Sequence, residues 1–320
     1  MIRDERVRRH SRALVMAIVA AAVSTLAAPV HGQAVDDGVL LARRDLVVGS
    51  MYAHDTWDEY WEGTRKRDNQ NIGTLTTRTS VWFANYGVTD RLTVLGAVPH
   101  VWTTASQGVL RSMEGFQDAS FTAKYSLFDQ PSSPVGGVRA IAVVSAALPL
   151  TGYTPDFYPL SIGTGSKRLS GRVTVSAQLR EGWSVTGSTA FTWRAGVTLD
   201  RPYYYTDGQL FLTDEVDMPN VTDFTVSASY GRSGWLGAFA YSQQVTLGGD
   251  DIRRQDMPFV SNRMNFSRLG GLVMAPVPFT SSLAVQFAYS YIIAGRNVGQ
   301  STTLATGLVY RLPFGTGRTQ

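Results

Sequence analysis

The residues best suited to acid–base chemistry lie in one short stretch, His54-Asp55 followed by Asp58 and Glu59. An imidazole oriented by a neighbouring carboxylate can act as a general base in hydrolysis or bind a metal ion. No second histidine stands at ligand spacing, so a polar strand end that runs into a solvated loop explains the cluster better. His100 is expected to be an inward polar residue of a strand. The sequence therefore predicts no catalytic residue, no metal site and no cofactor.

A second set of candidate site residues is cationic. Alternate residues of a strand point to the same side, and this rule places six basic side chains on the polar face of their segments. They are Arg78, Lys124, Arg172, Arg180, Arg194 and Arg311. If that face lines a water-filled cavity, it favours anions or carboxylates. Alternatively, the six pair with loop carboxylates folded over them, such as Asp156, Asp214, Glu215 and Asp217, and both interpretations stay open.

A third set is aromatic and lies in the long stretch 196–220. It comprises Tyr203, Tyr204, Tyr205 and Phe211. Connecting segments run over the surface and carry function more often than the elements that they join. We expect this loop to fold over or into the mouth of the structure and to offer an apolar docking surface.

The first 34 residues have the pattern of an export signal. Five arginines lie among residues 1–12, and a run of 16 mostly small apolar residues follows over 13–28. Small residues near 30–34 offer a cleavage site, and the run is shorter than the roughly 20 residues that a spanning helix needs. Removing 1–34 leaves 24 of the 29 basic and 23 of the 25 acidic residues. The mature chain, 35–320, is then nearly neutral, so no nucleic-acid partner is expected.

The mature chain repeats one pattern of alternating strands. In 116–128, the apolar Phe121, Ala123 and Tyr125 alternate with the polar Thr122 and Lys124. Alternation over about ten residues is typical of a strand with one face in lipid and one in a polar lumen, and such strands exceed the usual five or six residues of a soluble sandwich. Twelve strands are predicted: 46–57, 72–86, 91–105, 116–128, 137–150, 168–180, 183–195, 221–231, 235–247, 263–275, 282–295 and 302–314.

The connections between these strands alternate in length. The long ones are 58–71, 106–115, 151–167, 196–220 and 248–262. They alternate along the chain with short ones at 87–90, 129–136, 181–182, 232–234 and 276–281. Barrels of the Gram-negative outer membrane have short periplasmic turns and long extracellular loops. The sequence thus predicts an all-β transmembrane antiparallel β-barrel of about 12 strands in the outer membrane. Only 296–301 is short against this expectation.

Aromatic residues gather where the predicted strands end. They are Trp57, Trp102 and Trp193 beside long loops, and Trp183 and Trp235 beside short turns. Such rings resemble the two interfacial girdles of a membrane barrel, with outer-membrane lipid as their partner. The last strand carries Tyr310, Leu312 and Phe314 on one face, which looks like the signal that the barrel-assembly machinery recognises.

Two motifs resemble a known family. Tyr86-Gly87-Val88-Thr89-Asp90-Arg91-Leu92-Thr93-Val94, followed by Val98-Pro99, is similar to a strand-turn-strand element of the outer-membrane proteins associated with meta-pathway phenol degradation. The segment 115–128, with Gly-x-x-Asp before an alternating Lys-Tyr strand, is similar to that family's next strand. The resemblance implies a barrel that passes small hydrophobic or aromatic compounds. It brings no catalytic residues.

Three hypotheses about function follow. The first is an outer-membrane channel or facilitated-diffusion transporter for a small hydrophobic or aromatic solute, which is not an enzyme. The second is a structural or adhesive barrel with a plugged lumen. The third and weakest is a barrel-rim hydrolase that uses His54 with Asp55 or Asp58.

Overall fold

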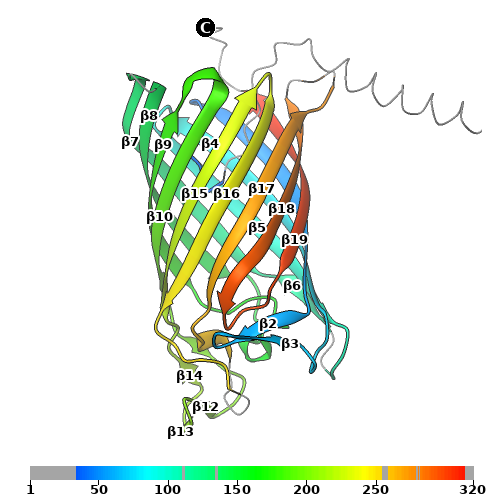
Figure 1. Cartoon of the computed structure of the whole chain (residues 1–320). Helices are drawn as coiled ribbons and strands as arrows, with labels where there is room; N and C mark the ends of the chain where they lie inside the picture. Colours follow the sequence, from blue (N-terminus) through cyan, green and yellow to red (C-terminus); the bar gives the residue numbers. More distant parts are fainter. Residues whose placement is uncertain are drawn as a thin grey trace, which may run out of the picture.

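Twelve long strands form one closed antiparallel barrel (Figure 1). This computed structural model describes residues 34–109, 112–133, 136–253, 259–278, 280 and 282–313, so all but the last residue of the expected signal at 1–34 lies outside the described residues, as does Phe314. The strands are β1 (Asp45–Trp57), β4 (Leu75–Thr89), β5 (Leu92–Ala105), β7 (Asp118–Ser133), β8 (Gly136–Pro149), β9 (Arg168–Gln178), β10 (Trp183–Arg194), β15 (Asn220–Arg232), β16 (Trp235–Leu247), β17 (Asn265–Pro276), β18 (Leu283–Arg296) and β19 (Thr302–Pro313). Each overlaps one predicted strand, which confirms the fold class.

The barrel closes between its first and last strands. β1 pairs with β19 from Asp45 opposite Pro313 to Thr56 opposite Thr302, and its other edge pairs with β4. The remaining strands pair with their neighbours in chain order. Lipid offers no partner to a backbone N–H or C=O, so a sheet can span a membrane only when it has no open edge.

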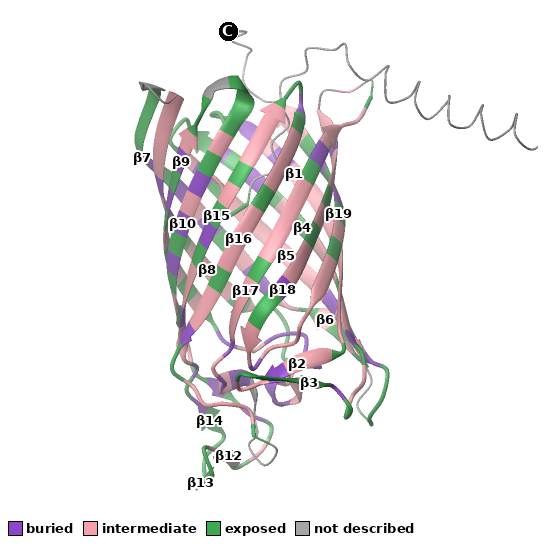
Figure 2. Cartoon of the chain, viewed as in Figure 1, coloured by how far each residue is buried: buried purple, intermediate pink, exposed green. Residues whose placement is uncertain are grey.

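The wall has an apolar outer face and a more polar inner face, and exposed residues alternate with less exposed ones along its strands (Figure 2). Outward side chains such as Trp82, Phe121, Phe239 and Leu304 are 49–62% exposed, whereas the inward Thr174 is fully buried. A soluble protein does not leave such a band of large apolar side chains in water. The outer face is therefore the lipid-facing surface of a transmembrane barrel.

The two ends of the barrel differ as predicted. At one end, the turn end, tight connections join the strands. The turns at Glu181-Gly182 and Ser233-Gly234 place both residues at positive φ, as the two-residue turns that suit strand twist require. Asp45 and Pro313 lie opposite each other at this same end. The long connections gather at the other end, the loop end (Figure 1).

The loops carry short elements of their own. They are β2 (Glu59–Glu62) with β3 (Arg65–Asp68), β6 (Ser112–Phe116) on the edge of β5, β11 (Val197–Thr198) with β14 (Glu215–Val216), β12 (Tyr204–Thr206) with β13 (Gln209–Phe211), and the 3-10 turns η2 (Pro155–Phe157) and η4 (Phe259–Ser261). A third 3-10 turn, η3 (Arg180–Gly182), lies at the turn end. No helix in the described residues is long and apolar enough to cross a membrane.

The assignment of the outer face predicts how an added arginine changes the stability of the barrel. Phe239→Arg places a guanidinium in the lipid, and we expect it to lower the free energy of unfolding by about 2–4 kcal/mol. Ala240→Arg, one residue along and on the lumen face, is the matched control and should cost less. Urea unfolding in vesicles, followed by loss of heat-modifiable gel mobility, measures both. Equal losses would contradict the assignment of the two faces.

Candidate functional site

The structure places four of the cationic candidates on the inner wall. Along their strands, the residues two positions away are mostly buried, and the intervening residues are mostly exposed and apolar. The four are Lys124, Arg172, Arg194 and Arg311. The side chain of Arg180 lies outside the described part of the structure. The prediction for Arg78 is wrong, and its correction follows from β-sheet register.

Arg78 lies on the outer face. It is opposite His54 on β1 and Trp102 on β5. It lies four residues before Trp82, which is 49% exposed, so both side chains point to the same side of β4. Both faces of 76–80 are polar in sequence, so alternation does not set the phase of β4 there. The register with the neighbouring strands sets it instead.

The same register separates His54 from Asp55, one of the two carboxylates suggested for the hydrolase. His54 is opposite the outward Leu304, whereas Asp55 lines a cavity inside the barrel and accepts a hydrogen bond from Thr303. Adjacent strand residues point to opposite faces, so the two cannot form a dyad. His100, expected inward, also faces outward, where its ring contacts Trp102 and Phe116.

Most inward cations are paired with carboxylates of the wall or of the chain before β1. Arg172 pairs with Asp223 on β15, Arg311 with Asp45, and Arg168 with Asp118. The expected loop partners are wrong for these residues, since Asp156 pairs instead with Arg201 of another loop. Arg194 forms no ion pair with a described carboxylate, and its Nε donates to the carbonyl of Pro219.

The segment 34–44 runs along the inner wall at the turn end. Lys124, whose side chain is fully buried, donates to the carbonyls of Ala34 and Asp37 and to the Asp37 carboxylate at 2.6 Å. The Leu41 N–H donates to the Thr93 hydroxyl. The polar inner face thus holds a peptide strand against itself through side chains, which narrows the lumen at this end.

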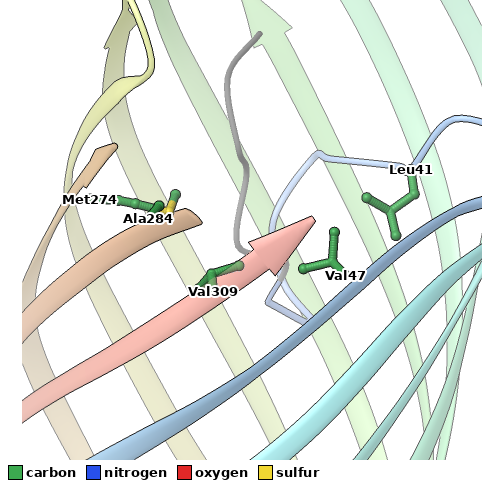
Figure 3. Packing of buried hydrophobic residues seen from close by; sticks show 5 residues of the cluster. All are labelled: Leu41, Val47, Met274, Ala284 and Val309. Carbon is green, nitrogen blue, oxygen red and sulfur yellow. The ribbon is translucent and has the colours of Figure 1, made fainter. Parts of the chain in front are cut away.

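Leu41 anchors the segment on its apolar side. It packs in a buried cluster with Val47, Met274, Ala284 and Val309, which come from four strands of the wall (Figure 3). At Gly87 a Cβ would lie 2.0 Å from the Ala42 carbonyl, so only glycine allows the segment to approach β4 this closely.

Asn297 joins three loops into a cap over the loop end. Its Oδ1 accepts the N–H groups of Gly63 and Ile252, and its Nδ2 donates to Asp251 and to the carbonyl of Arg263. Asn297 is 2% exposed and has a φ of 55°, a conformation that asparagine tolerates better than most residues. The short connection 297–301 is therefore the point to which the longer loops attach.

The loops 150–167 and 195–219 complete the cap. Tyr158 packs against a cluster of Val197, Leu199, Val216, Met218 and Val260, and Arg201 binds Asp156 at 2.7 Å. Burial raises the pKa of the Tyr158 hydroxyl. The base of loop 196–220 thus lies over the mouth, as expected.

The tip of that loop does not. The β12–β13 hairpin projects away from the barrel (Figure 1). Tyr204 stacks on Phe211 with ring centroids 5.0 Å apart and contacts the cap cluster, while Tyr203 and Tyr205 are exposed. The four docking candidates are therefore brought together on a projecting hairpin.

Three cavities that share lining residues follow one another at the loop end. The outer one, about 680 Å³, is polar and lies between β2, β3 and Ile252. The middle one, about 210 Å³, is apolar and is lined by Trp57, Ile72, Tyr158 and Met264 among others. The third, about 390 Å³, lies in the lumen and shares Trp57, Tyr158, Pro159, Val298 and Gly299 with the middle one. Tyr60, Asn71 and Ile252 line both the outer and middle cavities.

Sequence reasoning missed several residues of this passage. Trp57 is predicted to lie in a girdle, but its indole lies 2.4 Å from where a Gly299 Cβ would be and lines the middle cavity. Arg268 contacts the Phe266 ring and the Ser242 hydroxyl, and both residues face the lumen because the register of β17 with β16 is unbroken from Phe266 to Met274. The two-residue spacing of Phe266 and Arg268 was the available signal. Among the described residues, no group of three or more His, Cys, Asp or Glu could hold a metal ion.

The N-terminal segment predicts a measurable opening at the turn end. Removing one partner of a buried ion pair costs about 3–5 kcal/mol, so Lys124→Ala should free 34–44 from the wall. The chain has no cysteine, and Leu41→Cys therefore reports alone. We expect thiol labelling to be faster by about tenfold or more in the Lys124→Ala background. Arg139→Ala, which removes a longer contact to Gly38, should accelerate labelling less. Equal labelling rates of Leu41→Cys alone, with Lys124→Ala and with Arg139→Ala would contradict the role of Lys124 in holding the segment.

The cap predicts a dependence on acid. Hydrogen bonds from Arg296 lower the pKa of Asp251 from 3.8 to about 2. Because the folded pKa is the lower one, ionised Asp251 stabilises the cap above about pH 4, and this stabilisation is lost as the pH falls towards 2. Pepsin cleavage in 248–264 should rise over that interval. Asp251→Asn should be cleaved already at pH 4, and a flat wild-type profile would contradict the assignment.

Comparisons with known proteins agree with this architecture. The chain is similar to the COG4313 outer membrane channel from Pseudomonas putida F1, with 16% identity, 85% of this chain and 97% of that chain covered, and a TM-score of 0.69. The translocator domain of the autotransporter NalP from Neisseria meningitidis matches with 11% identity, 87% and 91% coverage, and a TM-score of 0.46. The TodX monoaromatic hydrocarbon channel, in a deletion mutant, matches with 10% identity, 86% and 91% coverage, and a TM-score of 0.45.

No curated protein sequence matches the chain. A family model, described as "Putative MetA-pathway of phenol degradation", matches residues 64–308. That match spans most of the barrel and includes both motifs on which the sequence resemblance rests. The chain therefore belongs to this family of outer-membrane barrels.

Proposed function

We propose that the protein is an outer-membrane channel that passes small aromatic or other apolar molecules one at a time. The observation that carries this proposal is the row of three cavities through the loop cap. An open porin needs no apolar chamber, and a structural barrel needs no passage. The expected signal at 1–34, the periplasmic position of the turn end and assembly through Tyr310, Leu312 and Phe314 belong to the same proposal.

The middle cavity selects for size and polarity. Its volume of about 210 Å³ is below the usual range of drug-sized binding sites, so it suits a molecule of about one aromatic ring. Trp57, Tyr158 and Met264 give it apolar walls. A small solute with apolar surface is stabilised there by about 25 cal/mol for each Å² of that surface removed from water, while an inorganic ion has no apolar surface to bury and loses hydration without compensation.

The lumen below is suited to onward diffusion. Its wall is more polar than that of the chamber, and most of its charges are paired, so we expect an apolar molecule to bind less tightly there than in the chamber. The segment 34–44 narrows the turn end, which is the feature that supports the alternative of a plugged structural or adhesive barrel. Movement of this segment would then be part of transport.

Blocking the chamber tests the proposal. Val298 lines both the middle and the lumenal cavity, and Val298→Trp should fill the junction between them. We expect uptake of benzyl alcohol into proteoliposomes to fall nearly to the rate of empty liposomes. Val273→Trp, on the exposed outer face of β17, is the matched control and should transport normally. Wild-type uptake no faster than that of empty liposomes would overturn the channel and favour the plugged barrel.

A further inference from the structure

We propose that the lumenal cavity holds a carboxylate subsite, formed by Arg168 with Arg194 beside it, and that a small aromatic monocarboxylic acid is a substrate. This inference rests on the proposed function, because it names a substrate class for the same passage.

Arg168 and Arg194 present like charges on neighbouring strands. They are directly opposite in the β9–β10 register, and both point inward. Like charges in this position destabilise a sheet unless an anion lies between them. Asp118 is the one described carboxylate that forms an ion pair with either arginine. It binds Arg168 and also accepts a hydrogen bond from the Tyr153 hydroxyl. Two positive charges thus meet one negative charge.

Both guanidinium groups have unused donors. The Nε of Arg168 and the Nη2 of Arg194 are buried and have no hydrogen-bond partner among the described residues, although a buried, unpaired N–H costs free energy. Arg168 lines the lumenal cavity together with Tyr158, and the charge of Arg194 acts on the Tyr158 hydroxyl. A carboxylate supplies the two acceptor oxygens that arginine binds best.

The rest of the cavity specifies an aromatic body with one charge. Trp57, Ile162, Phe266 and Val298 provide apolar contacts. Asp55 lies on β1, which is five pairings from β9 in one direction around the barrel and seven in the other, and so on the opposite wall. Its carboxyl group disfavours a second negative charge at the far end of the ligand.

Calorimetric titration of the full-length protein in detergent tests the subsite with benzoate and with benzyl alcohol, its neutral counterpart of similar size. We expect Arg194→Gln to weaken benzoate binding by about tenfold or more, the effect of one charge-assisted hydrogen bond, and to leave benzyl alcohol unchanged. Arg194→Lys keeps the positive charge and should weaken benzoate binding less. Arg78→Gln, the same change on the outer face, is the matched control. Terephthalate should bind more weakly than benzoate.

Heat-modifiable gel mobility shows that each variant is folded. Benzoate that binds no better than benzyl alcohol to the wild type, or equal effects of Arg194→Gln and Arg78→Gln, would overturn the subsite. If benzyl alcohol still enters proteoliposomes faster than it enters empty liposomes, the channel stands and only the subsite fails. If benzoate binds as expected but neither solute enters, the subsite stands and the channel fails.

Discussion

Closure of the sheet between β1 and β19 is the constraint on which the rest of the molecule depends. In lipid an unpaired backbone group has no alternative partner, so the register of every strand is fixed by its two neighbours. Because side chains alternate, one register sets all the outward and inward residues together. The apolar girdle and the charged lumen are therefore two consequences of the same hydrogen-bond ladder.

A wall fixed in this way makes the lumen a scaffold for less regular chain. The inward Lys124 and Thr93 hold the segment 34–44 by side-chain bonds, and Leu41 fills an apolar cluster between the strands. At the other end the short connection at Asn297 is the fixed point for Gly63, Asp251 and Arg263. The two narrow places of the passage thus arise from tertiary contacts with a rigid wall.

The strands were predictable because their signal is local. Two-residue periodicity and turn chemistry located all twelve, and the ends of β10, β16 and β18 fall within one or two residues of the prediction. The direction of the side chains of a strand was less certain where both faces are polar, as at Arg78. Pairing partners decide those positions, and a single strand does not contain them.

The sequence by itself determined a barrel of twelve strands with short turns at one end and loops at the other, because these features follow from local alternation and from the lengths of the connections. Only the tertiary structure decided which cations pair, that Arg194 meets no described carboxylate, and that Trp57, Tyr158 and Val298 enclose an apolar chamber. Those contacts join residues up to 266 positions apart in the chain, as between Asp45 and Arg311. No local pattern records which distant residues meet once the sheet has closed.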